Sequence, residues 1–163
     1  MASNVKKAVV KDLLEANKLI RKVKSESVSL KFQNLGFKDL HLLVYSDASH
    51  GNAEEDHSQG GQIVFLVEGE GKCIPICWTS KRIRRRSTLA AETLSMVDGI
   101  DLGIFLATLF CDLYYGVADS TLLPIKCITD CKSFCDAIKS NKLVTEKRLR
   151  LELSAIKENI HSN

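Results

Sequence analysis

Leu42-Leu43-Val44-Tyr45-Ser46-Asp47 is the stretch that decides the fold, because an apolar run ends there on an acid. The run predicts a strand over residues 41–46. The polar residues 47–60 that follow are expected to form a loop. Glu92 lies one turn into a helical pattern, and Asp130 follows a short apolar strand at 125–129. Acids placed in this way can converge on one point above a sheet.

Clustered carboxylates repel one another, and proteins that assemble them usually neutralise them with hard divalent cations such as Mg²⁺. Asp47, Glu92 and Asp130 are therefore candidates for a metal site. The alternative is that they are three unrelated surface acids, because Asp and Glu are also common as caps of helices and turns.

The remaining pattern predicts an α/β domain with a mixed sheet. Apolar periodicity predicts strands at 41–46, 61–67, 73–79 and 125–129, and helices at 5–25, 88–111, 132–140 and 145–160. Residues 68–71 have the composition of a tight hairpin turn, and Pro75 favours an edge strand or a bulge. Three antiparallel strands, a crossover helix and a parallel strand beside the first are expected, with helices on the sheet faces.

Composition is that of an ordinary globular domain of 163 residues, of which 45% are hydrophobic and 26% charged. We expect no membrane-spanning segment, because no apolar run approaches the roughly 20 residues that a bilayer requires, and the first seven residues lack the apolar core of a secretory signal. The six cysteines form no CxxC pair, so we expect reduced, mostly buried thiols without a disulfide partner, in an intracellular, reducing compartment.

Several positions have a structural interpretation. On the 88–111 helix the expected core side chains are Leu89, Met96, Val97, Ile100, Ile104, Phe105 and Leu109. Trp78 is expected in the core, and Ser87 or Thr88 is expected to cap the helix.

Five motifs, in order, resemble one family: Val44-Tyr45-Ser46-Asp47-Ala48-Ser49, Ser58-Gln59-Gly60-Gly61, Ile76-Cys77-Trp78-Thr79-Ser80-Lys81, Ser87-Thr88-Leu89-Ala90-Ala91-Glu92 and Thr129-Asp130-Cys131-Lys132-Ser133. Over residues 40–160 the chain resembles the ribonuclease H domain of copia-type (Ty1/copia) LTR-retrotransposon Pol polyproteins. Residues 1–36 resemble the connection from reverse transcriptase. The resemblance implies a ribonuclease H-like fold over 37–163 that is C-terminally truncated and lacks the last strand and helix.

The resemblance also implies an activity, which is metal-dependent hydrolysis of the RNA strand of RNA–DNA hybrids during reverse transcription. It implies two Mg²⁺ or Mn²⁺ ions, bridged by Asp47, with Glu92 holding one and Asp130 completing the shared site. Glu152 is a candidate fourth acid, but the favoured interpretation is a solvated helix position that pairs with Arg148 one turn earlier. Because the family's fourth acid belongs to the missing region, the alternative is a catalytically inactive module that binds nucleic acid or packs against a reverse transcriptase.

The expected partners are an RNA–DNA hybrid and the reverse transcriptase domain of the same polyprotein, with no membrane, in the cytoplasm, a retrotransposon particle or the nucleus. Residues 81–86 hold five cations before a helix start, where backbone N–H groups favour phosphates. The candidate nucleic-acid contacts are Lys81, Arg82, Arg84, Arg85, Arg86, Ser87, Gln59, Gly60, Lys132 and Ser133. The alternatives are a solvated loop for 81–86, a hairpin glycine at Gly60 and a plain helix start at Lys132.

Overall fold

The computed structural model describes residues 9–26, 29, 31–53, 57–83, 87–140 and 144–162. The chain divides into two compact units, residues 1–32 and 33–163. The first unit contains helix α1 (Val10–Ser25), which confirms the described part of the expected 5–25 helix. None of the α1 residues is buried, and its apolar side chains, among them Val10, Leu13 and Val23, are exposed.

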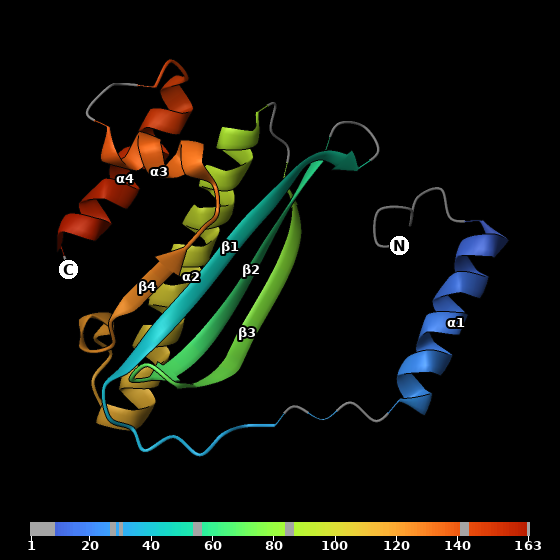
Figure 1. Cartoon of the computed structure of the whole chain (residues 1–163), viewed down its shortest axis with the longest axis horizontal. Coiled ribbons are helices and arrows are strands. Elements are labelled where there is room, and N and C mark those ends of the chain that lie inside the picture. The colour runs from blue at the N-terminus through green and yellow to red at the C-terminus, as the bar shows by residue number, and fades with distance from the viewer. Residues whose placement is uncertain are drawn as a thin grey trace. The chain divides into compact units, whose positions relative to one another are not determined.

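A four-stranded mixed sheet forms the centre of the second unit, as predicted (Figure 1). Its strands are β1 (Leu40–Ala53), β2 (His57–Glu68), β3 (Lys72–Ile83) and β4 (Ile125–Ile128), in the order β3-β2-β1-β4. The first three strands are antiparallel neighbours, and β4 runs parallel to β1. Parallel neighbours need a crossover connection, which the helix between β3 and β4 supplies.

The expected loop over 47–60 is wrong for the described residues, because β1 and β2 continue through it. Asp47 pairs with Gly61 and Ser49 pairs with Gln59, before the register shifts towards Ala53 and His57. Polar side chains do not prevent pairing, since the ladder satisfies backbone N–H and C=O groups whatever the side chains are. Asp47 therefore lies within a long paired strand and is not at a strand end.

The β2–β3 hairpin follows the sequence-based expectation. Gly69 has a φ of 57°, a conformation that glycine adopts without strain, at the turn between the two strands. β3 is an edge strand, and its register against β2 shifts beside Pro75, so that Ile76 is an extra residue. Both expectations for Pro75, an edge position and a bulge, are thus confirmed.

The predicted helices are present as α2 (Thr88–Tyr115), α3 (Lys132–Lys139) and α4 (Lys147–Ser162), with a short 3₁₀ turn, η2 (Ser120–Leu122), before β4. Ser87 caps α2 as expected, because its Oγ accepts the N–H of Ala90 at 3.2 Å. Figure 1 shows α2 running behind the sheet. Phe134 of α3 and Leu149, Leu153 and Ile156 of α4 pack with Met96 of α2 in one core cluster.

Small residues form the face of α2 that meets the sheet. Ala91, Ser95, Gly99, Gly103, Ala107 and Cys111 recur every fourth residue and are all buried. A Cβ on Gly99 or Gly103 would lie only 3.1 Å from a methyl group of Val44, so the helix approaches β1 closely. As a consequence, the prediction that Phe105 and Leu109 belong to the core is wrong. Phe105 and Leu109 are 62% and 42% exposed, because the close approach places them on the outer face.

Gly103→Leu should show how strongly the fold depends on this close approach. The larger side chain has to displace Val44 and Ile125, whose methyl groups a Cβ would already meet at 3.1–3.2 Å. We expect the free energy of unfolding to fall by about 1–3 kcal/mol, despite a gain in helix propensity of up to about 1 kcal/mol. Phe105→Leu on the exposed face is the control and should change stability by less than about 0.5 kcal/mol in the same denaturant titration.

Three further expectations need correction. Trp78 is 60% exposed, because it pairs with Ile63 on the sheet face opposite the buried Val64. Only Cys111 of the six free cysteines is buried. α2 is long and apolar enough to cross a membrane by length and composition, which the sequence reading overlooked, although its small-residue face packs on the sheet.

Candidate metal centre

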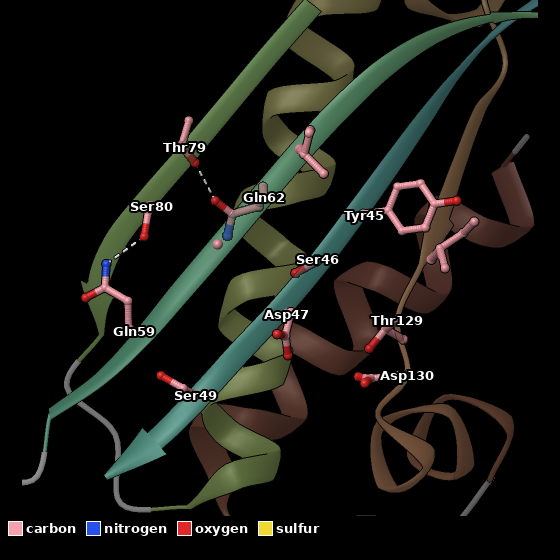
Figure 2. A pocket seen from close by; sticks show the side chains of 13 residues that line it. Tyr45, Ser46, Asp47, Ser49, Gln59, Gln62, Thr79, Ser80, Thr129 and Asp130 are labelled. Atoms are coloured by element: carbon pink, nitrogen blue, oxygen red, sulfur yellow. Dashed lines mark hydrogen bonds between the residues drawn. The ribbon is translucent and has the colours of Figure 1, made fainter. Parts of the chain in front are cut away.

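The three acids singled out in the sequence meet at one point. Asp47, Glu92 and Asp130 each present a carboxylate oxygen, and these oxygens all lie within 4.8 Å of one another. The parallel pairing explains part of this convergence, because Tyr45 is opposite Ile128 and each acid lies two residues further along. Figure 2 shows Asp47 on β1 and Asp130 in the segment after β4 at the same level of the sheet. Glu92 reaches the point from α2.

Glu92 is the buried member of the three, with 6% of its surface exposed. The backbone N–H of Ala48 donates to its carboxylate, but its Oε2 is buried without a hydrogen-bond partner. Burial, together with the negative charges of Asp47 and Asp130, raises the pKa of Glu92 above its ordinary value. A buried, unpaired carboxylate oxygen beside two further carboxylates is a costly arrangement for a protein to keep.

This donor set fits a hard divalent cation. Carboxylate oxygens are the ligands that Mg²⁺ and Mn²⁺ prefer, and a cation placed among the three acids would neutralise their repulsion. It would also give the unpartnered Oε2 of Glu92 a ligand to contact. Asp47, Glu92 and Asp130 are thus the residues that could hold such an ion.

A buried polar network, which the sequence reading missed, lies directly behind Asp47. Ser95 donates its hydroxyl to the backbone carbonyl of Asp47 at 2.9 Å. Ser95 in turn accepts from Ser46 Oγ and from Gln62 Nε2, each at 2.9 Å, and its carbonyl accepts from Gln62 at 3.0 Å. Thr79 Oγ1 donates to Gln62 Oε1 at 2.5 Å. The only sequence signal was a pair of polar residues, Gln62 and Ser95, on otherwise inward-facing positions.

A groove of about 670 Å³ opens beside Asp47 and Asp130. Its walls carry polar side chains such as Ser49, Gln59 and Ser80 together with apolar ones such as Tyr45, Ile63 and Ile128 (Figure 2). Gln59 donates to Ser80 Oγ at 2.8 Å. Gln59 pairs with Ser49, two residues after Asp47 on β1, and so lies on the same sheet face as the acid.

The other candidate nucleic-acid contacts fall into different surroundings. Arg82 is exposed and lies opposite Gln59 in the register of β3 and β2. The Lys81 ammonium lies 2.6 Å from a carboxylate oxygen of Asp98 on α2. Gly60 belongs to β2 and not to a turn. A Cβ there would collide with the side chain of Ile83, so close packing explains the glycine. Arg84, Arg85 and Arg86 lie outside the described residues.

Two further predictions concern the C-terminal helices. Glu152 lies half-buried in α4 and is not a member of the acidic cluster found among the described residues. Lys132 and Ser133 open α3 and are exposed just after Asp130. Ser133 Oγ lies 3.2 Å from Cys131 Sγ. The structure therefore brings together three of the four candidate metal ligands, and Lys132 and Ser133 follow one of them, Asp130, in the chain.

No protein-family model matches this chain, and no curated protein sequence matches it. Among solved structures, LC11-RNase H1 from a compost metagenome is similar, with a TM-score of 0.47 and 14% identity over 76% of this chain and 77% of that one. The same protein in complex with an RNA/DNA hybrid gives 0.46, with 14% identity over 75% and 78% of the two chains. Prototype foamy virus protease–reverse transcriptase gives 0.46, with 11% identity over 85% of this chain and 18% of that one. Because these scores are low, the functional proposal rests on the carboxylates.

Proposed function

We propose that this chain is a divalent-metal-dependent nuclease that hydrolyses the RNA strand of RNA–DNA hybrids. The observation that carries the proposal is the convergence of Asp47, Glu92 and Asp130 within 4.8 Å, with one buried carboxylate oxygen left unpartnered. A protein gains nothing in stability from such a cluster, so a role in binding cations is its simplest explanation.

The chemistry is an in-line displacement at phosphorus. Two Mg²⁺ or Mn²⁺ ions, when bound, would lower the pKa of a water molecule and neutralise charge on the phosphate. The oxygen of that water forms a bond to phosphorus and releases a proton to solvent. The bond between phosphorus and the 3′ oxygen breaks, and this oxygen takes up a proton, which yields a 5′-phosphate and a 3′-hydroxyl. The two exposed acids, Asp47 and Asp130, face the groove, while Glu92 is fixed from behind by the N–H of Ala48.

The groove supports a nucleic acid as substrate. Ser49, Gln59 and Ser80 offer hydroxyl and amide groups along the groove that Asp47 and Asp130 also line, and hydrogen bonds to a 2′-hydroxyl are how proteins tell RNA from DNA. Arg82 is exposed beside Gln59, where its guanidinium could pair with a phosphate. Lys132 and Ser133 are exposed at the start of α3, two and three residues after Asp130, and are further candidates for contact with the nucleic-acid backbone.

We further propose that the domain acts in retrotransposon reverse transcription, as a part of a Pol polyprotein that includes a reverse transcriptase. The support is the order of the five motifs, which resembles the copia-type ribonuclease H domain. Helix α1 adds to it, because an amphipathic helix is suited to packing its apolar face on another domain.

An inactive hybrid-binding module is the second candidate. It is favoured by the fact that Glu152 does not join the other acids, which leaves a cluster of three within the described part of the chain. Such a module would keep the groove and the metal-free fold, but it would not turn substrate over.

A substrate panel separates these candidates. The purified chain is incubated in Mg²⁺ with four labelled substrates of one sequence: RNA–DNA hybrid, duplex RNA, duplex DNA and single-stranded RNA. We expect cleavage of the RNA strand of the hybrid only, because the proposed activity needs a 2′-hydroxyl on the strand that is cut and a DNA strand paired with it. Binding of the hybrid without product would favour the inactive module, and equal cleavage of duplex DNA would refute hybrid specificity.

A further inference from the structure

We propose that Ser95 is a positioning residue that sets the spacing between Asp47 and Glu92. The inference rests on the proposed metal-dependent function, and it concerns how the fold holds the ligands. Ser95 does not belong to the acidic cluster, and its hydroxyl is fully buried. It lies three residues after Glu92 on α2, so the two side chains share one face of the helix.

One peptide unit of β1 is held at both ends by these two residues. Ser95 Oγ donates to the carbonyl of Asp47 at 2.9 Å, and the N–H of Ala48, in the same peptide unit, donates to the Glu92 carboxylate. Two residues of α2 thereby hold the peptide unit of β1 that follows the Asp47 side chain. The distance between the Asp47 backbone and the Glu92 carboxylate follows from these two bonds, since neither the strand nor Glu92 can move far without breaking one of them.

The hydroxyl of Ser95 is itself fixed by its partners. It has one hydrogen to donate, which goes to Asp47, so Ser46 and Gln62 must both be donors to its lone pairs. The Nε2 group of Gln62 donates to the hydroxyl and to the carbonyl oxygen of Ser95, and Gln62 Oε1 accepts from the hydroxyl of Thr79. The orientation of every group in this chain of bonds is therefore determined, from the exposed Thr79 on β3 to the carbonyl of Asp47.

The small residues of α2 make the arrangement possible. The Ser95 hydroxyl can reach the backbone of β1 only where the helix lies close to the strand. Gly99, one turn later, permits that approach, because a Cβ at this position would come close to Val44 and Gln62. A buried polar network that is fully satisfied is rigid and specific. Loosening it should therefore impair the binding of cations more than the stability of the fold.

The test compares Ser95→Ala with Thr93→Val in the complete chain. Thr93 is a matched control, because its buried hydroxyl bonds only to Leu89 O within the same helix. Mg²⁺ affinity is measured by titration calorimetry. We expect Ser95→Ala to weaken binding about 10- to 100-fold, as loss of a group that orients a metal ligand does, and Thr93→Val to stay within about twofold of the wild type.

A metal-free readout accompanies the titration, namely the hydrogen-exchange rate of the Ala48 amide. We expect Ser95→Ala to accelerate exchange at Ala48 but not at Val44, which lies in the core of the same strand. If Ser95→Ala does not fold, Thr79→Val serves instead, with the same direction and a smaller effect. Thr79→Ser, which keeps the hydroxyl, should restore wild-type affinity.

Unchanged Mg²⁺ affinity and unchanged Ala48 exchange in Ser95→Ala would overturn the proposal. A wild-type chain that binds Mg²⁺ through these acids but does not cleave hybrids would refute the proposed function and leave the positioning role intact. A wild-type chain that binds no Mg²⁺ would refute both.

Discussion

Asp47→Asn should abolish hybrid cleavage without harming the fold. Asp47 is the acid that faces the groove from β1, and asparagine has the same size but lacks the charge that holds a hard cation. Removing a group that merely orients a ligand costs about 10- to 100-fold, so loss of the ligand itself should reduce the cleavage rate by more than about 100-fold. Initial rates on a labelled hybrid, at saturating Mg²⁺, measure the effect.

The matched control for this variant is Asp101→Asn. Asp101 is exposed on α2 outside the acidic cluster, so the same change of charge there should leave the rate unaltered. Thermal unfolding of Asp47→Asn without metal should occur no lower than in the wild type, because the substitution removes a charge that repels Glu92. Substantial cleavage by a homogeneous Asp47→Asn preparation would show that the activity arises elsewhere.

Glu92→Gln should stabilise the metal-free protein and remove its response to Mg²⁺. The side-chain carbonyl oxygen of the new amide can still accept a hydrogen bond from the N–H of Ala48. The NH₂ group would take the place of the unpartnered carboxylate oxygen, beside two carboxylates that accept hydrogen bonds. Relief of a buried, unsatisfied polar atom should raise the free energy of unfolding by about 1–3 kcal/mol at neutral pH in EDTA.

The pH dependence follows from the raised pKa of Glu92. The native state holds this proton more tightly than the unfolded chain, so Glu92 lowers stability as the pH rises above the ordinary value of 4.5 towards the raised pKa. The advantage of Glu92→Gln over the wild type should therefore be small near about pH 4 and should grow as the pH rises towards the raised pKa of Glu92. Mg²⁺ should raise the unfolding temperature of the wild type alone, since it binds the folded acids. A Glu92→Gln variant that is less stable than the wild type at neutral pH in EDTA would contradict this reasoning.

The acids and the order of elements could be predicted from sequence because local signals mark them. Apolar runs of distinct period identified β4 and α2, and Ser87 is a preferred helix cap. Asp47, Glu92 and Asp130 were recognisable from their flanking motifs, and the predicted parallel pairing of β1 with β4 brings two of them to one level.

The errors arose where tertiary contacts override local character. Polar residues from Asp47 to Ala53 looked like a loop, but pairing with β2 keeps them in a strand. Large apolar side chains such as Phe105 were placed in the core, whereas the helix face that meets the sheet consists of small residues. The hydrogen bond between Gln62 and Ser95 joins residues that are 33 positions apart, and no local sequence pattern predicts a bond of this kind.

The most direct test of the central claim is the cleavage of an RNA–DNA hybrid by the EDTA-treated chain as Mg²⁺ is added back. The account predicts no product in EDTA and, as Mg²⁺ increases, RNA fragments that end in 3′-hydroxyl and 5′-phosphate groups, from a water attacking phosphorus at the three acids. Cleavage that persists in EDTA, or fragments that end in 2′,3′-cyclic phosphate, would contradict it, because such products need neither the cation nor the carboxylates.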